Sequence, residues 1–206
     1  MREITALFWD VGGVLLTNGW DRASRHRAAE QFHLDWEDFQ DRHELVIADF
    51  ETGRLTLEEY LERTIFHRPR RFTREEFTAF MWAQSQPIRE TLAIVERLAR
   101  SGRYLLATLN NESLELNEYR IERFGLRNLF ALFFSSCFLG VRKPDRAIYQ
   151  IVLRVTQRTP EECLFIDDRA LNLECARQLG MRTIHYQNPQ QLQRELRRHG
   201  VALELQ

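Results

Sequence analysis

The chain has 206 residues, of which 44% are hydrophobic and 29% are charged, so it is long enough for one α/β domain with a small insertion and has the composition of an ordinary folded protein. With a formal net charge of -1, the chain lacks the excess of basic residues that binding to nucleic acid requires. The sequence contains neither an apolar stretch long enough to span a bilayer nor a basic signal-peptide start, so we expect a cytoplasmic protein without membrane or nucleic-acid partners.

The strand predicted first is the apolar run Ile4 to Trp9, which ends in Asp10 and the glycine pair Gly12-Gly13. A buried strand that runs into a glycine-containing loop is a typical start for a catalytic loop in an α/β protein. From about Asp21 to Phe80 the apolar residues then adopt helical spacing, which predicts an all-helical segment.

Capping boxes mark helix starts inside and after this segment. Thr56 with Glu59 and Thr73 with Glu76 fit the pattern in which a threonine and a glutamate three residues later bond to each other's backbone. A third box, formed by Thr159 and Glu162, precedes a later strand. The two boxes inside the segment predict separate short helices.

Helices and strands alternate along the rest of the chain. Helices are predicted at 87–102, 113–124, 144–155, 171–179 and 189–198, and strands at 104–109, 132–134, 164–166 and 182–186. This alternation predicts a parallel sheet with right-handed crossovers, and hence an α/β fold with a Rossmann-like core in three α/β/α layers. We expect this core at residues 1–16 and 86–206, with residues 17–85 forming a small inserted helical cap.

Polar residues follow four of the predicted strands. They are Asp10, the pair Asn110-Asn111, Lys143 and the pair Asp167-Asp168. Because the carboxyl ends of parallel strands meet at one edge of a sheet, we expect these residues to lie together. Three clustered carboxylates would repel one another unless a hard cation bound there, so the pattern indicates a Mg²⁺ site beside a nucleophilic Asp10.

Lys143 stands out in the composition. It is the sole lysine, because the other basic residues are all arginine. We infer that its position requires a compact ammonium where a planar guanidinium would not fit. The cysteines Cys137, Cys163 and Cys175 lack metal-type spacing and are expected to pack as reduced thiols.

Each polar residue also has a structural explanation when it is taken alone. Asp10 could close a loop, Asn110-Asn111 and Asp167-Asp168 could cap the helices that follow, and Lys143-Pro144 could form a surface turn. Their occurrence in this order, each after its own strand, favours the catalytic interpretation.

The chain resembles the haloacid dehalogenase superfamily of hydrolases over nearly its whole length, in the subgroup with a helical cap after the first motif. The four motifs are FWDVGGVLL, TLNNES, GVRKPDRAIY and LFIDDRALNLECARQLGM. The resemblance implies that Asp10 is the nucleophile and a Mg²⁺ ligand, and that Gly12 offers its backbone carbonyl to the metal. It also implies that Lys143 steadies the nucleophile and the phosphate.

The fourth motif implies the remaining metal ligands. By the same resemblance, Asp168 binds the metal directly. Asp167 contacts the metal through a water molecule or holds the groups that bind it, and Asn172 orders this loop. Asn110, Asn111 and Gly13 are expected to contact the phosphate, the last through its backbone amide.

Two positions depart from the pattern of that superfamily. Most of its phosphatases carry an aspartate as general acid two residues after the nucleophile, where this chain has Gly12. A general acid contributes about 10²- to 10⁴-fold, so its absence favours a substrate whose leaving group needs little protonation, such as an anomeric sugar phosphate; the DxGGV pattern resembles that of sugar-phosphate phosphatases. Asn110 replaces the usual serine or threonine, and its amide can still donate to phosphate.

We therefore predict a magnesium-dependent phosphatase that acts on a small phosphorylated metabolite through an aspartyl-phosphate on Asp10. A catalytically weakened binding or regulatory protein is one alternative, which Gly12 and Asn110 favour. A 2-haloacid dehalogenase is another, which the metal-binding pair Asp167-Asp168 disfavours. The expected partner is the small phosphorylated substrate, and nothing in the sequence specifies an oligomeric state.

The predicted cap offers side chains for substrate selection. Trp20 could stack on a sugar or ring, or simply pack at the hinge. An arginine group could hold a second anionic group, or could form a solvated face. Its members are Arg68, Arg70, Arg71 and Arg74.

Overall fold

The computed structural model describes residues 2–203. Five parallel strands form one sheet in the order β3-β2-β1-β4-β5, which confirms the α/β fold class. The strands are β1 (Ala6–Trp9), β2 (Leu105–Asn110), β3 (Leu132–Ser135), β4 (Cys163–Asp167) and β5 (Arg182–His185). Because β1 lies at the centre of this order, the loop that follows it is flanked by those of β2 and β4.

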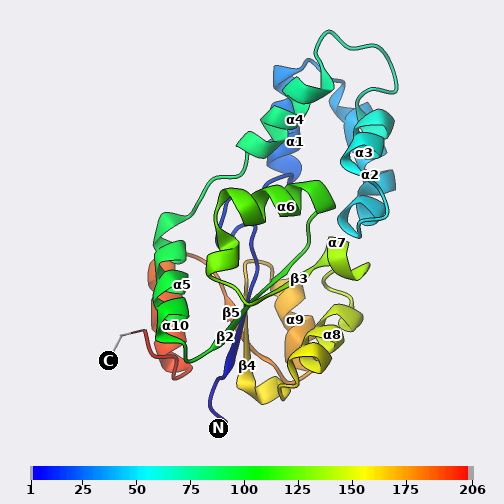
Figure 1. Cartoon of the computed structure of the whole chain (residues 1–206). Helices are drawn as coiled ribbons and strands as arrows, with labels where there is room; N and C mark the ends of the chain where they lie inside the picture. The colour runs from blue at the N-terminus through cyan, green and yellow to red at the C-terminus, as the bar shows by residue number, and fades with distance from the viewer. Residues whose placement is uncertain (1, 204–206) are drawn as a thin grey trace.

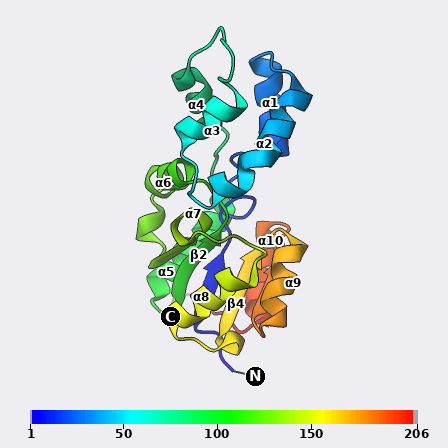
Figure 2. The ribbon, with the colours of Figure 1, turned by 90° about the vertical axis from the view of Figure 1, so that its right-hand side faces the viewer.

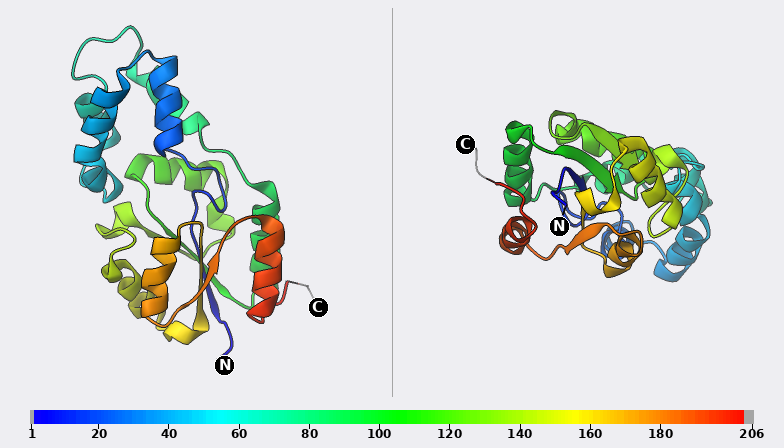
Figure 3. Two further views of the ribbon diagram at one scale, coloured as in Figure 1. Left: turned by 180° about the vertical axis from the view of Figure 1, so that it is seen from behind. Right: turned by 90° about the horizontal axis from the view of Figure 1, so that it is seen from below.

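Helices cover both faces of the sheet and give the three layers (Figure 3). On one face lie α5 (Arg89–Ser101) and α10 (Pro189–Arg198). On the other lie α8 (Arg146–Thr156) and α9 (Ala170–Gln178). Along β1, Leu7 packs in the first apolar cluster and Phe8 in the second, which is the alternation expected of a strand buried on both faces.

The cap consists of four helices that lie between β1 and α5 in the sequence (Figures 1 and 2). They are α1 (Arg22–Gln31), α2 (Trp36–Glu51), α3 (Leu57–Thr64) and α4 (Arg74–Ala83). Both predicted capping boxes are confirmed at the starts of α3 and α4. The cap has its own aromatic core, which includes Phe39, Phe50 and Phe77, and the domain boundaries at residues 17 and 85 stay a prediction.

Two helices of the core lie below the cap, α6 (Leu114–Arg123) and α7 (Ser136–Leu139) (Figure 2). The short helix α7 was not expected from the sequence, and it separates β3 from the loop of Lys143. Two 3-10 turns complete the fold, η1 (Leu126–Asn128) and η2 (Pro160–Glu162). The third capping box is confirmed on η2, where it leads directly into β4.

In the described part of the chain, no helix has the length and apolar character needed to cross a bilayer. The three cysteines are all unpaired thiols, with Cys163 buried and the other two half-buried. Cys163 and Cys175 pack with the second apolar cluster, as the sequence predicts, whereas Cys137 belongs to none of the apolar clusters.

Candidate active site

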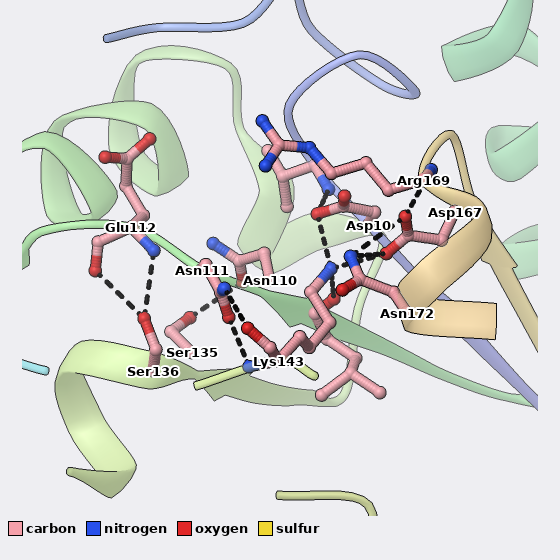
Figure 4. A network of polar contacts seen from close by, with 12 residues as sticks. Asp10, Asn110, Asn111, Glu112, Ser135, Ser136, Lys143, Asp167, Arg169 and Asn172 are labelled. Atoms are coloured by element: carbon pink, nitrogen blue, oxygen red, sulfur yellow. Dashed lines mark hydrogen bonds and ion pairs between the residues drawn. The ribbon is translucent and has the colours of Figure 1, made fainter. Parts of the chain in front are cut away.

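The side chains predicted to act together converge at the carboxyl edge of the sheet, beneath the cap. Asp10 follows β1, Asp167 ends β4, and Lys143 reaches in from the loop after α7 (Figure 4). The backbone amide of Asp10 donates to the carbonyl of Ile166 at 2.9 Å, which ties the loop after β1 to β4. Parallel pairing of β1 with β2 and β4 therefore brings residues distant in the sequence to one edge.

Lys143 forms the centre of the site. Its Nζ lies 3.0 Å from Oδ1 of Asp10 and 2.6 Å from Oδ2 of Asp167, and it donates to the carbonyl of Leu109 at 2.9 Å. The side chain is almost fully buried, with 1% exposed. The charges of Asp10 and Asp167 outweigh the effect of burial and raise the pKa of Lys143, so the ammonium is a permanent counter-charge.

Asp167 is held on all sides. Besides the contact with Lys143, its carboxylate accepts from Asn172 Nδ2 at 3.0 and 3.1 Å and from the backbone amide of Arg169 at 2.7 Å. Because both oxygens of Asp167 already accept hydrogen bonds, this residue is suited to holding the groups around the metal rather than to binding the metal directly. Asn172 orders this loop as the fourth motif implies.

Asp168 has the opposite character. Its Oδ1 is buried and has no hydrogen-bond partner among the described residues, and one carboxylate oxygen each from Asp10, Asp167 and Asp168 lie within 4.8 Å of one another. Burial and the charge of Asp167 raise the pKa of Asp168. An unpartnered carboxylate in an all-oxygen cluster is what a hard divalent cation requires, so these residues fit Mg²⁺.

Burial also acts on the predicted nucleophile. It raises the pKa of Asp10 to about 7, the neighbouring charges of Asp167 and Asp168 act in the same direction, and Lys143 opposes them. The contacts of its carboxylate fall on Oδ1, which accepts from the amide of Val11 at 2.8 Å and from Lys143. Among the described residues Oδ2 is left without a hydrogen-bond donor.

Asp10→Asn is expected to stabilise the metal-free protein more at high pH than at low pH. The pKa of Asp10 is about 7 in the folded state and near 3.8 when unfolded, so its protonation stabilises the fold fully below about pH 4, and this stabilisation is lost as the pH rises through about 7. Asparagine has no charge to bury, and the gain should reach about 1–4 kcal/mol near pH 8. Urea denaturation in EDTA near pH 4 and pH 8 measures it; equal differences would contradict the burial of an ionised Asp10.

Gly13 allows Asp168 to approach the site. Its φ is +76°, and a Cβ at this position would lie 2.3 Å from Oδ2 of Asp168, a separation that side chains do not tolerate. Gly102 also has a positive φ, of +62°, but a Cβ there would meet nothing within 4 Å. Both glycines have a left-handed backbone, and only at Gly13 would a Cβ meet Asp168, which makes Gly102 a control for the backbone strain.

Gly13→Ala is therefore expected to abolish most of the stabilisation by Mg²⁺, because the new methyl group displaces Asp168. Gly102→Ala carries the backbone strain alone, about 1–2 kcal/mol, and should keep the full effect of the metal. Melting temperatures with and without Mg²⁺ measure the difference. If both variants respond to the metal as the parent does, Asp168 is not a ligand.

Asn110 and Asn111 both lie at the carboxyl edge of the sheet, but their side chains bond to different partners. Asn111 bonds both backbone groups of Lys143, donating to its carbonyl and accepting from its amide at 2.8 Å each. Asn110 departs from the expectation that it faces the phosphate: its Nδ2 donates to Asn117 and its Oδ1 accepts from Ser135. The longer amide reaches past the site into a buried polar cluster, and only 1% of Asn110 is exposed.

A cavity of about 480 Å³ opens between this site and the cap. Asp10, Gly12 and Lys143 line its floor, and Trp20, Arg25 and Phe50 of the cap line its other side. Trp20 packs in the cap core, and its Nε1 donates to Tyr60 at 2.8 Å. These contacts agree with the packing role, whereas stacking on a sugar or ring stays a prediction. The predicted arginine group does not line the cavity; Arg68 pairs with Asp38, and Arg74 with Glu62.

Arg120 is a residue that sequence reasoning missed. It is 2% exposed and donates to the carbonyl of Thr17, to Ser85 Oγ at 2.9 Å and to Glu112 at 2.9 Å. Since Thr17 and Ser85 belong to the two connections between core and cap, Arg120 fixes both connections to α6. The helical pattern of α6 gave no signal of this role.

Gly12 leaves the position two residues after Asp10 without a carboxylate. A Cβ at Gly12 would lie 3.0 Å from Asn18 Oδ1 and 3.6 Å from Arg120 Nη1. Neutral and cationic groups thus fill the space beside Gly12, so leaving-group protonation must come from elsewhere.

Comparison with known proteins identifies a family that the chain matches. A family model described as haloacid dehalogenase-like hydrolase matches residues 4–180. Flavin mononucleotide hydrolase 1 of Arabidopsis thaliana is 28% identical over 164 residues, covering 80% of this chain and 66% of that protein. A sesquiterpene phosphatase of Aspergillus oryzae is 36% identical over 58 residues, covering 28% of this chain and 30% of its own. The chain thus spans less than two thirds of these curated relatives.

Solved structures share the fold. A predicted HAD-like family hydrolase from Porphyromonas gingivalis has a TM-score of 0.78 at 23% identity, with 95% of this chain and 99% of that chain covered. A HAD family enzyme from Bacteroides thetaiotaomicron, solved as a magnesium complex, has a TM-score of 0.76 at 20% identity, with 91% and 95% covered. At these identities the likeness concerns the fold.

Proposed function

The chain belongs to the haloacid dehalogenase-like hydrolases, and from this premise we propose that it is a phosphatase that cleaves small phosphomonoesters through an aspartyl-phosphate on Asp10. The observation that carries the proposal is the contact of Asp10 with the buried ammonium of Lys143 at 3.0 Å, beside Asp168 with its unpartnered oxygen. The name of the Arabidopsis relative, a hydrolase of flavin mononucleotide, supports a phosphate ester as the class of substrate.

In the first step Oδ2 of Asp10 attacks the phosphorus atom and the bond from phosphorus to the ester oxygen breaks. The released alkoxide takes its proton from water. Lys143 holds Oδ1 and so fixes the direction of attack, while its charge compensates the negative charge on the phosphoryl oxygens. Bound Mg²⁺, held by Asp10, Asp168 and the carbonyl of Gly12, would supply further compensation of charge. Water then attacks the phosphorus of the acyl phosphate, releasing inorganic phosphate and restoring Asp10.

The test is phosphate release from a panel of sugar phosphates, nucleotides, flavin mononucleotide and small phosphomonoesters, with Mg²⁺ and with EDTA. We expect release that requires Mg²⁺. Anomeric sugar phosphates should rank high, because their leaving groups need the least help from an acid at the position of Gly12. Silence across the whole panel, with a folded protein, would reject the phosphatase.

A regulatory binding protein is the second candidate, and the geometry around Gly12 is the observation that favours it. Without an acid beside Asp10, bound phosphate esters could persist rather than react. The two candidates separate on the same panel, because a binding protein would show Mg²⁺-dependent affinity for a phosphate ester by calorimetry while releasing no phosphate.

A further inference from the structure

The cap holds a buried positive charge that no part of the described chain neutralises. Arg25 of α1 is 6% exposed. Its Nη1 donates to the carbonyl of Trp20 at 2.7 Å, and its Nε and Nη2 both donate to Oε1 of Gln40 at 3.2 Å. All these acceptors are neutral, and no described carboxylate oxygen lies within 4.0 Å of the guanidinium.

Such burial is unfavourable, because a charged group loses water and gains no counter-charge. Burial lowers the pKa of Arg25, and Tyr60, Asp21 and Glu51 act in the other direction without outweighing it. A guanidinium nevertheless stays protonated. The cap therefore carries an uncompensated cation.

The neighbouring histidine adds no charge of either sign. Nδ1 of His43 lies 2.8 Å from the hydroxyl of Tyr60. Burial, together with the charge of Arg25, lowers the pKa of His43 to about 3, so the imidazole is neutral near pH 7. Among the charged cap side chains that line the cavity, Arg25 is thus the one that is buried. Of the others, Asp21 caps α1, Arg22 lies over the ring of Trp36, and Glu51 pairs with Arg142.

This wall faces the reactive site across the same cavity. Arg25, Trp20, His43 and Phe50 line it together with Asp10. The volume of about 480 Å³ is within the range of ordinary small-molecule sites. A molecule whose phosphoryl group lies at Asp10 therefore has its remaining part directed toward the cap.

The guanidinium is also held in advance for binding. Gln40, which receives two of its bonds, donates from Nε2 to Glu44 at 2.9 Å and is fixed by that contact. Each Nη of Arg25 uses one N–H on the contacts above, so each has a second N–H to offer. A guanidinium with an N–H left on each Nη can bind a carboxylate or phosphate in a bidentate manner.

We propose that the substrate is a small phosphomonoester with a second anionic group, either a carboxylate or another phosphate, and that Arg25 binds this second group while Asp10 reacts with the phosphoryl group. The inference rests on the proposed function and deepens it. It also relocates the second-anion site from the arginines at 68–74, which lie away from the cavity.

The experiment compares substrates that differ only in the second anion. The pair 3-phosphoglycerate and glycerol 3-phosphate tests a carboxylate; glucose 1,6-bisphosphate and glucose 1-phosphate test a phosphate. In one of the pairs, we expect the parent to prefer the member with the second anionic group at least about tenfold in kcat/KM. Arg25→Gln should lower kcat/KM for that member about 10- to 100-fold and change its partner less than about threefold. Arg25→Lys keeps the charge without the paired N–H groups and should restore only part of the loss.

Arg27→Gln is the matched control, because Arg27 is exposed, lies on the same helix and does not line this cavity. It should retain the preference of the parent. If Arg25→Gln slows both members of each pair equally, or if the parent shows no preference, Arg25 only ties α1 to Trp20 and the proposal is overturned.

Calorimetry on Asp10→Asn separates this proposal from the phosphatase itself. Tighter binding of the member with the second anionic group, lost on adding Arg25→Gln, supports the anion site even if the parent releases no phosphate. Equal binding of both members overturns the anion site, and release of phosphate by the parent would then leave the phosphatase standing.

Discussion

Asp10→Asn is expected to lower kcat for phosphate release by at least about 10³-fold, because it removes the nucleophile rather than a supporting contact. The loss should persist at saturating substrate and Mg²⁺, since the amide retains the hydrogen bonds of Oδ1 but cannot form an acyl phosphate. Phosphate release under steady-state conditions measures it.

Asp49→Asn provides the control. Asp49 is exposed on the cap surface, so the same chemical change there should leave kcat within about twofold, as for surface substitutions in general. Should Asp10→Asn retain more than a tenth of the parent rate on every accepted substrate, the covalent route through Asp10 would be untenable.

Lys143→Met has the second largest expected effect, and it combines lost activity with lost stability. The substitution leaves Asp10 and Asp167 without the ammonium that contacts both. Removing one partner of a buried ion pair costs about 3–5 kcal/mol, and we expect this loss in the free energy of unfolding of the metal-free protein. We also expect kcat to fall at least about 10²-fold.

Lys143→Arg tests the meaning of the sole lysine. Lys143 is 1% exposed and touches three acceptors, so the wider guanidinium should not fit, and activity should stay low although the charge is kept. Urea denaturation and phosphate release on both variants provide the data. Full activity of Lys143→Arg would mean that a compact ammonium is not required.

Much of the site followed from the parallel sheet that the sequence predicts. Because parallel strands end at one edge, a residue after β1 and a pair after β4 had to meet, and Asp10 and Asp167 do. Gly13 was predicted to donate its amide to phosphate, but that amide donates to the carbonyl of Leu16 at 2.7 Å. The structure gives another reason for glycine there, the approach of Asp168.

Other features depend on tertiary packing that no local pattern contains. Asn110 lies at the expected edge, but the polar ends of Asn117 and Ser135 draw its side chain away from the cavity. Arg25 belongs to a helix that looks polar all round in the sequence, RASRHRAAEQ, so its burial against Gln40 and Trp20 is visible only once α2 is packed beside α1.

The most direct test of the account is chemical trapping of the covalent intermediate. An aspartyl-phosphate is reduced by borohydride to homoserine, whereas a free carboxylate is not, and peptide mass spectrometry locates the change. After quenching the parent during turnover, we predict homoserine at position 10 and at no other aspartate, and only when substrate and Mg²⁺ are both present. Rapid phosphate release without any modification of Asp10 would contradict the account.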